Sequence, residues 1–591
     1  MIFLYNRDNR VLRPSPQRRG YYTLKMINNL KGAKPPKIIT DLRHLVQSSA
    51  EKFGDSYLYK YKVGDSFVEY SYNQLWKEMN EFGTALAQHG LMGRPIAVIG
   101  DTHPHYICTY FATVNGGGYI VPIDKELAIE QIVAFLELAE VEAVVYTAAI
   151  NNKIAACADQ LPRVKAFIPI HPETEEIVTD KTLTFPALLE EGKQALADGV
   201  TTYLDYEIEM EKMAALLFTS GTTGTSKGVM LSHKNLTAAT NASCLSMSYD
   251  DNNYFVSVLP PHHSYEMTCG HLAMINIGGH VLINDSLKHV MRNFKEGAPN
   301  ALALVPLYVE TMHRKIWDTV RRNGMEKRLR TGMKISSALL AVGIDRRRQI
   351  FSQVLEAFGG ELKSIVCGGA PLSPQLIKDF YAFGVTVLEG YGITECAPLV
   401  AVNSPGKIRF HSVGTPVRGC QVKIDKTEEE ETGEILVKGD NVMMGYYRNP
   451  EATAEVFTED GWFRTGDIGY MDKDGYIYIT GRKKNVIILS NGKNVFPEEL
   501  EEYLMHLESV EEVVVLAREN ENKDLTITAL IVPNAEYFGE KSKDEIYAQI
   551  KAEVNEINKK LPSFKQIREI ELREEKFERN TSRKIQRFKV K

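Results

Sequence analysis

The chain has 591 residues, a formal net charge of −6 at pH 7, 44% hydrophobic residues and 25% charged residues. This length exceeds one compact core, so we expect two or more domains. The composition is typical of soluble globular proteins, and with no nucleic-acid-binding motif it argues against a chain that binds polyanions along its whole length.

The cysteine pattern and the hydropathy pattern both predict a cytoplasmic protein. The seven cysteines are scattered and none forms a C-x-x-C pair, so neither a zinc site nor a redox pair is indicated. No apolar run approaches the roughly 18 to 20 residues that span a bilayer. The apolar run Met1–Tyr5 precedes the arginines, which reverses the order found in a secretory signal.

Residues 1–35 differ from the rest of the chain. They are rich in arginine, are interrupted by Pro14 and Pro16, and show no lasting apolar face. We interpret them as a basic N-terminal extension, disordered or loosely docked. Two alternatives stay open: contact with an anionic surface at the inner face of a membrane, and a true start at Met26.

From Ile39 onwards, strand-like and helix-like segments alternate. The strand-like apolar runs are residues 95–100, 119–123, 143–146, 166–170, 301–305 and 364–367. This alternation predicts an α/β fold, with a large, multi-layered domain at residues 36–482 whose β-sheets are covered by helices. Residues 308–358 are expected to be helical and are rich in Arg and Lys. A solvated face is the first interpretation, and contact with a membrane or an anionic ligand is the second.

The pattern changes after about Val437 to short strands and tight turns. Residues 510–515 and 525–532 are strand-like, and residues 543–560 are helix-like. These elements predict a small, mobile α+β domain at residues 483–591, joined to the large domain by a hinge near Lys484.

The strongest chemical signal is the loop Thr219–Gly228, with the sequence TSGTTGTSKG, which follows an apolar strand. Glycines allow the backbone to approach a ligand, and hydroxyl and N–H groups donate to phosphate oxygens. The lysine follows Gly224 by three residues and is not followed by Ser or Thr, so the loop is not the common P-loop. A flexible linker is the alternative, but linkers rarely lie between apolar strands.

This loop resembles the signature of the adenylate-forming acyl-CoA synthetases, adenylation domains and luciferases, and the resemblance extends over about residues 39–591. It implies that the loop binds the phosphates of ATP. The residues implied are Thr219, Ser220, Gly221, Thr222, Thr223, Gly224 and Lys227.

The other motifs of this family follow in order. Cys367–Leu372, which includes Gly369 and Ala370, is similar to the segment beside adenine. The segment EGYGITE is similar to the family's Y-G-x-T-E motif and implies that Gly390, Tyr391 and Gly392 contact the purine, that Thr394 donates to the α-phosphate, and that Glu395 binds Mg²⁺ together with Thr219.

Further matches concern the acid, the ribose and the thiol. His263, in PPHHSY, is similar to the histidine that borders the acyl pocket. Asp467 resembles the ribose ligand, and Arg482 lies at a position near the ribose and phosphates. Gly492 belongs to a loop that resembles the one near the pantetheine tunnel of coenzyme A. Lys584 resembles the catalytic lysine, although Asn580 and Arg583 replace the usual threonine and glycine.

The resemblance implies two half-reactions. The acid first attacks the α-phosphate of ATP, with Lys584, Mg²⁺ and the Thr219–Gly228 loop offsetting the negative charge. Rotation about Lys484 then withdraws Lys584 and brings the Gly492 loop inward, so that a thiol can attack the acyl-AMP.

The substrate is expected to be a medium- or long-chain fatty acid, because residues 305–355 are similar to the long-chain branch of the family. Coenzyme A is the expected acceptor. Three alternatives remain: an acyl-carrier-protein ligase, an aryl- or branched-acid ligase, and a catalytically silent nucleotide-binding regulatory protein. The presence of Glu395, Asp467, Arg482 and Lys584 argues against the last of these.

Overall fold

Four of the predicted apolar runs form the β4-β3-β5-β6 end of a seven-stranded sheet with the order β18-β8-β7-β4-β3-β5-β6. Its strands are β3 Ile96–Ile99, β4 Ile120–Ile123, β5 Ala143–Tyr146, β6 Ala166–Pro169, β7 Met213–Thr219, β8 Lys227–Ser232 and β18 Gly445–Tyr446. Strands β3 to β6 are parallel and buried at every position, which explains their uninterrupted apolar sequences. The strands expected here from the sequence are confirmed.

Helices cover both faces of this sheet, because successive side chains of a strand point to opposite sides. Ile96 and Val98 of β3 pack into one hydrophobic cluster, and Ala97 and Ile99 pack into another. The first cluster includes helices α1 Leu42–Phe53, α2 Tyr72–Gln88, α3 Pro104–Asn115, α6 Phe185–Ala197 and α7 His233–Ser246. The second includes α4 Ile129–Leu138 and α5 Asn151–Cys157. The computed structural model describes residues 36–170, 179–219, 226–247, 252–489, 494–519, 525–579 and 585–590.

Two further sheets complete most of the large domain. One has the order β2 Ser66–Ser71, β1 Tyr57–Val63, β10 His280–Ile283 and β9 Tyr254–Ser257. The other has the order β11 Ala301–Leu304, β12 Ser364–Cys367, β13 Thr386–Gly392, β14 Leu399–Val402 and β15 Thr415–Pro416. Helices α9 Val290–Gly297, α10 Pro306–Arg322 and α14 Pro374–Phe383 contribute to a hydrophobic cluster with β11 and β12. The turn η3 Glu266–Leu272 is a π-helix and continues into α8 Ala273–Ile277.

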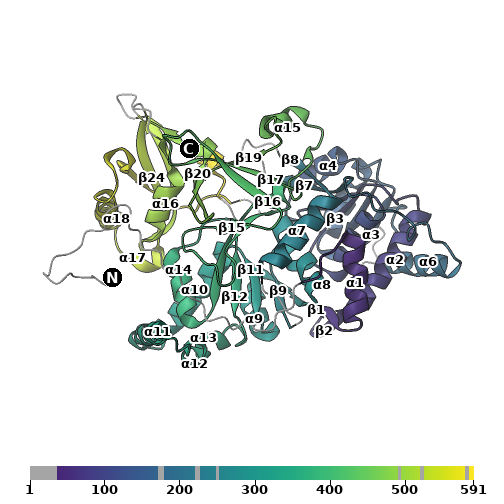
Figure 1. The fold of residues 1–591 in the computed structure, drawn as a ribbon, viewed down its shortest axis with the longest axis horizontal. Coiled ribbons are helices and arrows are strands. Elements are labelled where there is room, and N and C mark those ends of the chain that lie inside the picture. The colour runs from purple at the N-terminus through teal and green to yellow at the C-terminus, as the bar shows by residue number, and fades with distance from the viewer. Residues whose placement is uncertain are drawn as a thin grey trace.

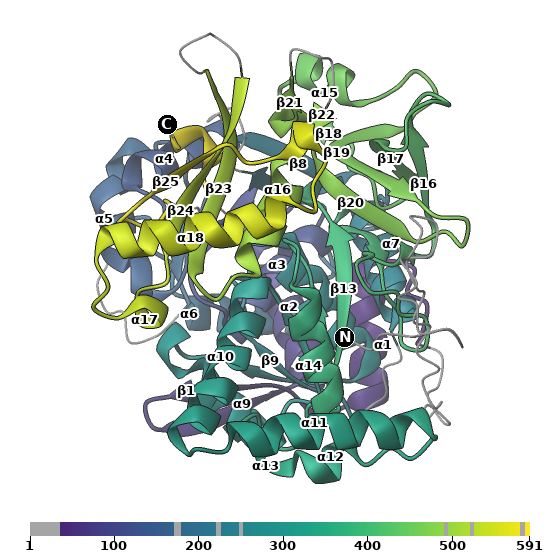
Figure 2. The same ribbon diagram turned by 90° about the vertical axis from the view of Figure 1, so that its left-hand side faces the viewer.

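The basic segment at residues 308–358 is helical, as predicted, but it is broken into four helices. They are α10, α11 Glu326–Ala341, α12 Arg347–Ile350 and α13 Ser352–Glu356. Gly324 and Gly343 lie at two of the breaks with φ of 63° and 83°, a left-handed conformation that ends a helix. Figures 1 and 2 show α11, α12 and α13 together at the lower end of the molecule.

An antiparallel sheet leads from the large domain to the small one. Its strands are β16 Cys420–Asp425, β17 Gly433–Gly439, β19 Phe463–Met471 and β20 Ile477–Arg482, with α15 Pro450–Val456 between β18 and β19. The short strands β21 Ile487–Ile488 and β22 Asn494–Val495 follow.

The C-terminal elements have a hydrophobic cluster of their own, as expected for a separate α+β domain. They are α16 Pro497–Met505, β23 Val510–Glu519, β24 Leu525–Pro533, α17 Ala535–Phe538, α18 Lys543–Asn558 and β25 Glu569–Leu572. In Figure 2 this yellow domain lies above α10 and α14. The predicted α/β fold class, with large and small domains, is confirmed. Among the described residues, no helix has both the length and the apolar character needed to cross a bilayer.

Candidate active site

A single cleft contains every predicted site residue that the structure describes. These are Thr219, Lys227, His263, Gly369, Ala370, Gly390, Tyr391, Gly392, Thr394, Glu395, Asp467, Arg482 and Lys484. The cleft is lined by both domains, because residues of α16 and β23 also face it. Three sets of predicted residues lie outside the described ranges: Ser220 to Gly224, Gly492 and Lys584.

A buried carboxylate, that of Asp467, lines this cleft. Asp467 on β19 is 3% exposed, accepts a hydrogen bond from the hydroxyl of Tyr391 at 2.6 Å, and pairs with Nε of Arg482 at 2.8 Å. The strand pairing of β19 with β20 places Asp467 opposite Arg482. Burial, followed by the charge of Asp467, raises the pKa of Tyr391 well above its usual value. The hydroxyl therefore stays protonated and donates to the carboxylate.

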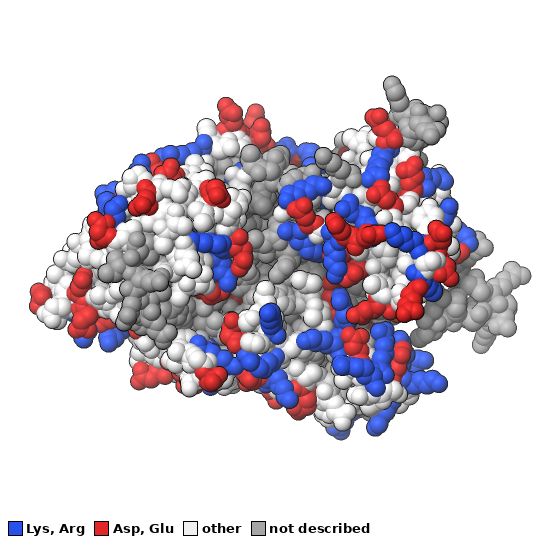
Figure 3. Space-filling view, turned by 180° about the vertical axis from the view of Figure 1, so that it is seen from behind, with Lys and Arg blue, Asp and Glu red and all other residues white. Residues whose placement is uncertain are grey.

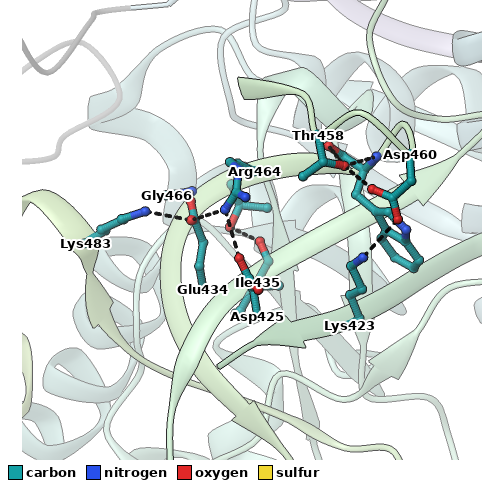
Figure 4. A network of polar contacts seen from close by, with 11 residues as sticks. Lys423, Asp425, Glu434, Ile435, Thr458, Asp460, Arg464, Gly466 and Lys483 are labelled. Carbon is teal, nitrogen blue, oxygen red and sulfur yellow. Dashed lines mark hydrogen bonds and ion pairs between the residues drawn. The ribbon is translucent and has the colours of Figure 1, made fainter. Parts of the chain in front are cut away.

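The turn that presents Asp467 is held by Glu434, which is 6% exposed on β17 (Figure 4). The carboxylate of Glu434 accepts hydrogen bonds from the backbone N–H of Gly466 at 3.1 Å and from Arg464 at 3.1 Å. Lys483 also binds it, at 2.8 Å. Gly466 has a φ of 71°, a conformation that favours glycine. Glu434 thus links the Asp467 turn to the predicted hinge.

The predicted pivot, Lys484, lies in the short 3₁₀ turn η6 Lys483–Asn485, directly after β20. Burial lowers its pKa to about 8, and the neighbouring charge of Arg482 adds to this effect. Asn485 donates a hydrogen bond to Glu498 on α16 at 2.6 Å, so the turn contacts the first helix of the small domain. A change at η6 would therefore move α16 relative to β20.

One residue distant in sequence, Tyr446, connects the end of the predicted phosphate loop to Glu395. Thr219 and Lys227 face each other across the β7–β8 ladder, and the hydroxyl of Thr219 donates to the carbonyl of Lys227 at 3.3 Å. Nζ of Lys227 lies 4.6 Å from the ring centre of Tyr446. The hydroxyl of Tyr446 donates to Oε1 of Glu395 at 3.0 Å. The ammonium group and the carboxylate are therefore held near one another.

The predicted adenine-side residues come from the ends of two parallel strands. Gly369 and Ala370 follow β12, and Gly390 to Gly392 end β13. Gly369 has a φ of 91°, a left-handed conformation that favours glycine. The backbone therefore turns beside the cleft without placing a side chain there. Thr394 begins a 3₁₀ turn after β13 and carries Glu395 with it. Because parallel strands end at the same edge of a sheet, their loops meet in the cleft.

The ring of the predicted acid-side histidine lies tilted against that of its neighbour. The rings of His262 and His263 are 4.1 Å apart, and both residues line the cleft. Burial lowers the pKa of His262 to about 4, so this ring is neutral at pH 7 although Asp124 lies 3.6 Å away. Tyr265 donates a hydrogen bond to the carbonyl of Val366 at 3.1 Å, which fixes this loop to β12.

Comparison with known proteins identifies the family. Residues 46–447 match the family described as AMP-binding enzyme, and residues 484–591 match the AMP-binding enzyme C-terminal domain. The chain is an AMP-binding, adenylate-forming enzyme. This confirms the family resemblance inferred from the Thr219–Gly228 loop and from the motifs that follow it.

Relatives of this adenylate-forming enzyme include one plant ligase and one animal ligase. It is 27% identical to the chloroplastic long-chain-fatty-acid–acyl-carrier-protein ligase of Arabidopsis thaliana, over 83% of this chain and 76% of the relative. It is also 27% identical to a long-chain-fatty-acid–CoA ligase of Gallus gallus, over 93% of this chain and 78% of the relative. Among solved structures, ATP-bound MatB of Rhodopseudomonas palustris is similar with a TM-score of 0.70 and 23% identity, covering 92% of this chain and 97% of MatB, which shows the fold.

Two residues of the adenylate-forming site were not predicted from the sequence. Tyr446 lies in a two-residue strand with no motif around it, so nothing in the sequence signalled its contact with Glu395. Glu434 left a weak signal, as a charged residue at the start of β17, directly before its apolar residues. Its contacts with Gly466 and Lys483 depend on residues about thirty and fifty positions further along the chain.

A buried polar cluster in this enzyme begins directly after the His263 loop. Glu266 is fully buried, and the hydroxyl of Ser257 lies 2.5 Å from its Oε1. His271, also fully buried, has its Nδ1 3.1 Å from the hydroxyl of Tyr59. Burial raises the pKa of Glu266 to about 8 and lowers that of His271 to about 3. Both side chains are therefore neutral at pH 7 in the folded protein.

This cluster predicts a stability loss above neutral pH that Glu266→Gln removes. In the unfolded chain Glu266 ionises near 4.5, so between there and about 8 the folded state holds the extra proton, and the free energy of unfolding falls as pH rises. The shifted pKa of His271 has the opposite effect, because it makes the free energy of unfolding rise with pH, but only between about pH 3 and pH 6.5. From pH 6.5 to 8 His271 no longer offsets the Glu266 contribution, which amounts to about 2 kcal/mol over this range and is isolated from other titrating groups by the difference between the wild type and Glu266→Gln. Denaturation midpoints measured across this range test it, and parallel pH curves for the wild type and Glu266→Gln would contradict it.

Proposed function

We propose that this enzyme activates a medium- or long-chain fatty acid as its acyl-AMP and transfers the acyl group to coenzyme A. The observation that carries the proposal is the convergence of Tyr391, Glu395, Asp467 and Arg482 in one cleft. A buried carboxylate, an aromatic ring and a basic side chain are what a nucleotide's ribose, base and phosphates require.

In the first half-reaction, a carboxylate oxygen of the acid forms a bond to the α-phosphorus of ATP, and the bond from that phosphorus to the bridging oxygen breaks. Pyrophosphate leaves with the bonding electrons. Two anions must meet, so the reaction needs fixed positive charge. Lys227, positioned by Tyr446, faces the cleft from the large domain. Lys584 is proposed to supply the second charge from the small domain.

In the second half-reaction, the thiol sulfur of coenzyme A bonds to the acyl carbon, the bond from that carbon to the phosphate oxygen of AMP breaks, AMP leaves with the bonding electrons, and the thiol proton is released to solvent. Lys584 must withdraw before the thiol can approach. The turn at Lys484 connects β20 to α16 and is proposed as the pivot for that movement. Gly492 is proposed to move inward at the same step.

The residues present fit a magnesium ion that is held mainly by the nucleotide. Mg²⁺ is commonly bound by one or two carboxylates together with substrate phosphates. Glu395 supplies one carboxylate in the cleft, which Thr219 also lines. Among the residues that the structure describes, no group of three or more His, Cys, Asp or Glu side chains forms a metal cage. When bound, the ion would stabilise charge on the departing phosphates.

The choice of a fatty acid rests on apolar lining near His263. Four apolar residues line the same cleft: Met247 directly after α7, Phe255 on β9, Cys269 on η3 and Met274 on α8. An alkyl chain placed there would be removed from water, which stabilises binding by about 0.8 kcal/mol per CH₂ group. The names of the Arabidopsis and Gallus relatives support the same class of acid.

Acid-dependent release of pyrophosphate from Mg·ATP tests the proposal. Acetate, octanoate, palmitate and benzoate are compared, with and without coenzyme A, and the acyl-CoA product is measured. Fast turnover to a thioester with octanoate or palmitate is expected. Preference for benzoate or acetate would contradict the assignment of a fatty acid, and release without any thioester would contradict coenzyme A as acceptor.

A carrier protein is the second candidate acceptor, because the Arabidopsis relative is named for it. The two acceptors are separated by supplying palmitoyl-AMP with either free coenzyme A or a phosphopantetheinylated acyl carrier protein. Thioester formation on the carrier protein alone would replace the first candidate with the second.

Glu395→Gln is expected to raise the Mg²⁺ concentration needed for half-maximal pyrophosphate release. The increase should be at least about tenfold, since even outer partners of a metal ligand are worth 10- to 100-fold in affinity. Tyr446→Phe is the matched control, because it keeps the carboxylate and removes only the hydroxyl bound to Oε1. A larger shift for Tyr446→Phe than for Glu395→Gln would show that Glu395 is not the ligand.

A further inference from the structure

Helix α11 and the loop after it form an outer surface that the proposed reaction does not use. We call Lys327, Arg328, Lys334, Ile335, Val342 and Ile344 the α11 surface. The helix lies along the lower edge of the molecule in Figure 2, and α11 to α13 project at the lower left in Figure 1. Figure 3, the view from behind, shows Lys and Arg crowded at the corresponding lower right, with few acidic residues.

The inner side of α11 is fixed to the protein. Leu329 and Ser336 are buried, and the hydroxyl of Ser336 donates to the carbonyl of Ala382 on α14 at 3.3 Å. The guanidinium of Arg330 lies 4.7 Å from the ring centre of Trp317 on α10. These contacts fix the orientation of α11 about its own axis, and the residues on its opposite side face solvent.

The helical spacing collects the outer residues into two adjacent rows. Lys327 and Lys334 are seven residues apart, and so are Arg328, Ile335 and Val342. Residues seven apart lie two turns apart on one face of a helix. Cations and branched aliphatic side chains are thus interleaved on the outer face.

The positive charge of this surface is not neutralised locally. The acidic residues between positions 321 and 350 are Glu326 and Asp345, and each pairs with its own arginine: Glu326 with Arg330 at 2.9 Å, and Asp345 with Arg347 at 2.7 Å. Within the described ranges, Lys327, Arg328 and Lys334 pair with no carboxylate. Their charges are available to an external anion.

The aliphatic side chains on the same surface are unusually exposed. Val342 is 72% exposed, Ile335 is 52% and Ile344 is 47%. Single exposed apolar residues are common on proteins, but these three accompany cations on one projecting helix and its loop. Apolar side chains beside Lys and Arg are typical of helices that lie in the interface of a membrane.

We propose that the α11 surface docks this enzyme on an anionic lipid bilayer. Lys327, Arg328 and Lys334 contact the lipid headgroups, and Ile335, Val342 and Ile344 enter the interface. A bilayer suits this surface better than an acidic protein, because a projecting ridge needs a matching groove on a folded partner, whereas lipids deform around it. The cleft is lined at its α10–α12 end by Arg321 and Arg347, so docking would bring that end towards the bilayer. The inference goes beyond the proposed function and is tested by binding rather than by turnover.

The first test compares two triple variants of the full chain. One is Lys327→Gln, Arg328→Gln and Lys334→Gln, and the other carries the same charge change on exposed lysines of the small domain, Lys551→Gln, Lys559→Gln and Lys560→Gln. Binding is measured to vesicles of phosphatidylcholine alone or mixed with phosphatidylglycerol. The α11 variant should bind mixed vesicles about 100-fold more weakly than the wild type, at about fivefold per charge, and the control should bind as the wild type does.

Residues 1–35 are also basic, but they are present in both variants, so their contribution cancels. Equal binding by the wild type and the α11 variant would overturn the proposal. So would a loss of thioester formation on an acidic carrier protein with unchanged vesicle binding, because that result would make the surface a protein-docking site.

A second test locates the contact. All seven native cysteines are buried, so Val342→Cys can be labelled selectively with an environment-sensitive dye. Its emission should shift to the blue when mixed vesicles are added. A dye at Tyr537→Cys, an exposed position on α17, should not shift. Vesicle binding without a shift at position 342 would place the contact elsewhere and refute the proposal.

Discussion

Lys584→Ala should slow acyl-AMP formation by about 100- to 1,000-fold, while the transfer of supplied acyl-AMP to coenzyme A stays near the wild-type rate. Loss of one preorganised charge donor at a transition state costs about 3 to 4 kcal/mol. The lysine is proposed to act only in the first half-reaction, because the small domain withdraws it before the thiol attacks. Pyrophosphate release and thioester formation from synthetic acyl-AMP measure the two half-reactions separately.

The residues that flank Lys584 are held by the small domain, which supports its role there. Arg579 forms a bridge with Ile585 and pairs with Glu512 on β23 at 2.8 Å. Arg587 donates to the carbonyl of Val515 at 3.2 Å. The described residues on both sides of Lys584 are therefore held by the small domain.

Lys589→Ala is the control for Lys584→Ala. Lys589 lies close in sequence and binds Glu578 at 2.5 Å, so its removal changes the local charge without removing the proposed catalytic group. Both half-reactions should be nearly unaffected. An equal loss of both half-reactions in Lys584→Ala would refute its assignment to adenylation.

The sequence predicted the elements best where burial is uniform. Strands β3 to β6 are buried on both faces and read as uninterrupted apolar runs, so their positions follow from composition alone. The helix ends in the basic segment were harder to predict, because two of its three breaks depend on single glycines, Gly324 and Gly343, within otherwise good helix-forming sequence. Local propensity indicates a helix there, and only the left-handed φ angles show where it ends.

Site residues were predicted where a motif carried them, and missed where tertiary packing did. Asp467 and Arg482 lie in recognisable motifs, but their pairing follows from the β19–β20 register, which no motif encodes. Glu434 and Tyr446 lie in short or apolar strands and reach the site through side-chain contacts across the fold. Such partners have no local signature, because what they position is distant in sequence.

Asp467→Asn should lower kcat/KM for ATP by about 100-fold. The change keeps the shape of the side chain but removes the charge, and hydrogen bonds to charged groups contribute about 1.5 to 3 kcal/mol each. The new amide would also place N–H groups or a weaker acceptor against Nε of Arg482, now 2.8 Å from the carboxylate. Equilibrium ATP binding and pyrophosphate release measure the effect, and thermal denaturation checks that the variant is folded.

The ribose contact can be separated from the structural role by changing the nucleotide. If Asp467 accepts hydrogen bonds from the ribose hydroxyls, the wild type should prefer ATP to 2′,3′-dideoxy-ATP, and Asp467→Asn should lose most of that preference. Tyr391→Phe is the matched control, because it removes the 2.6 Å hydrogen bond to Asp467 but leaves the carboxylate paired with Arg482. It should weaken ATP use by about tenfold and keep the preference for the ribose hydroxyls. If Asp467→Asn discriminated between the two nucleotides as strongly as the wild type, the carboxylate would serve only to hold Tyr391 and Arg482, and the ribose would have to be bound by another group in the cleft.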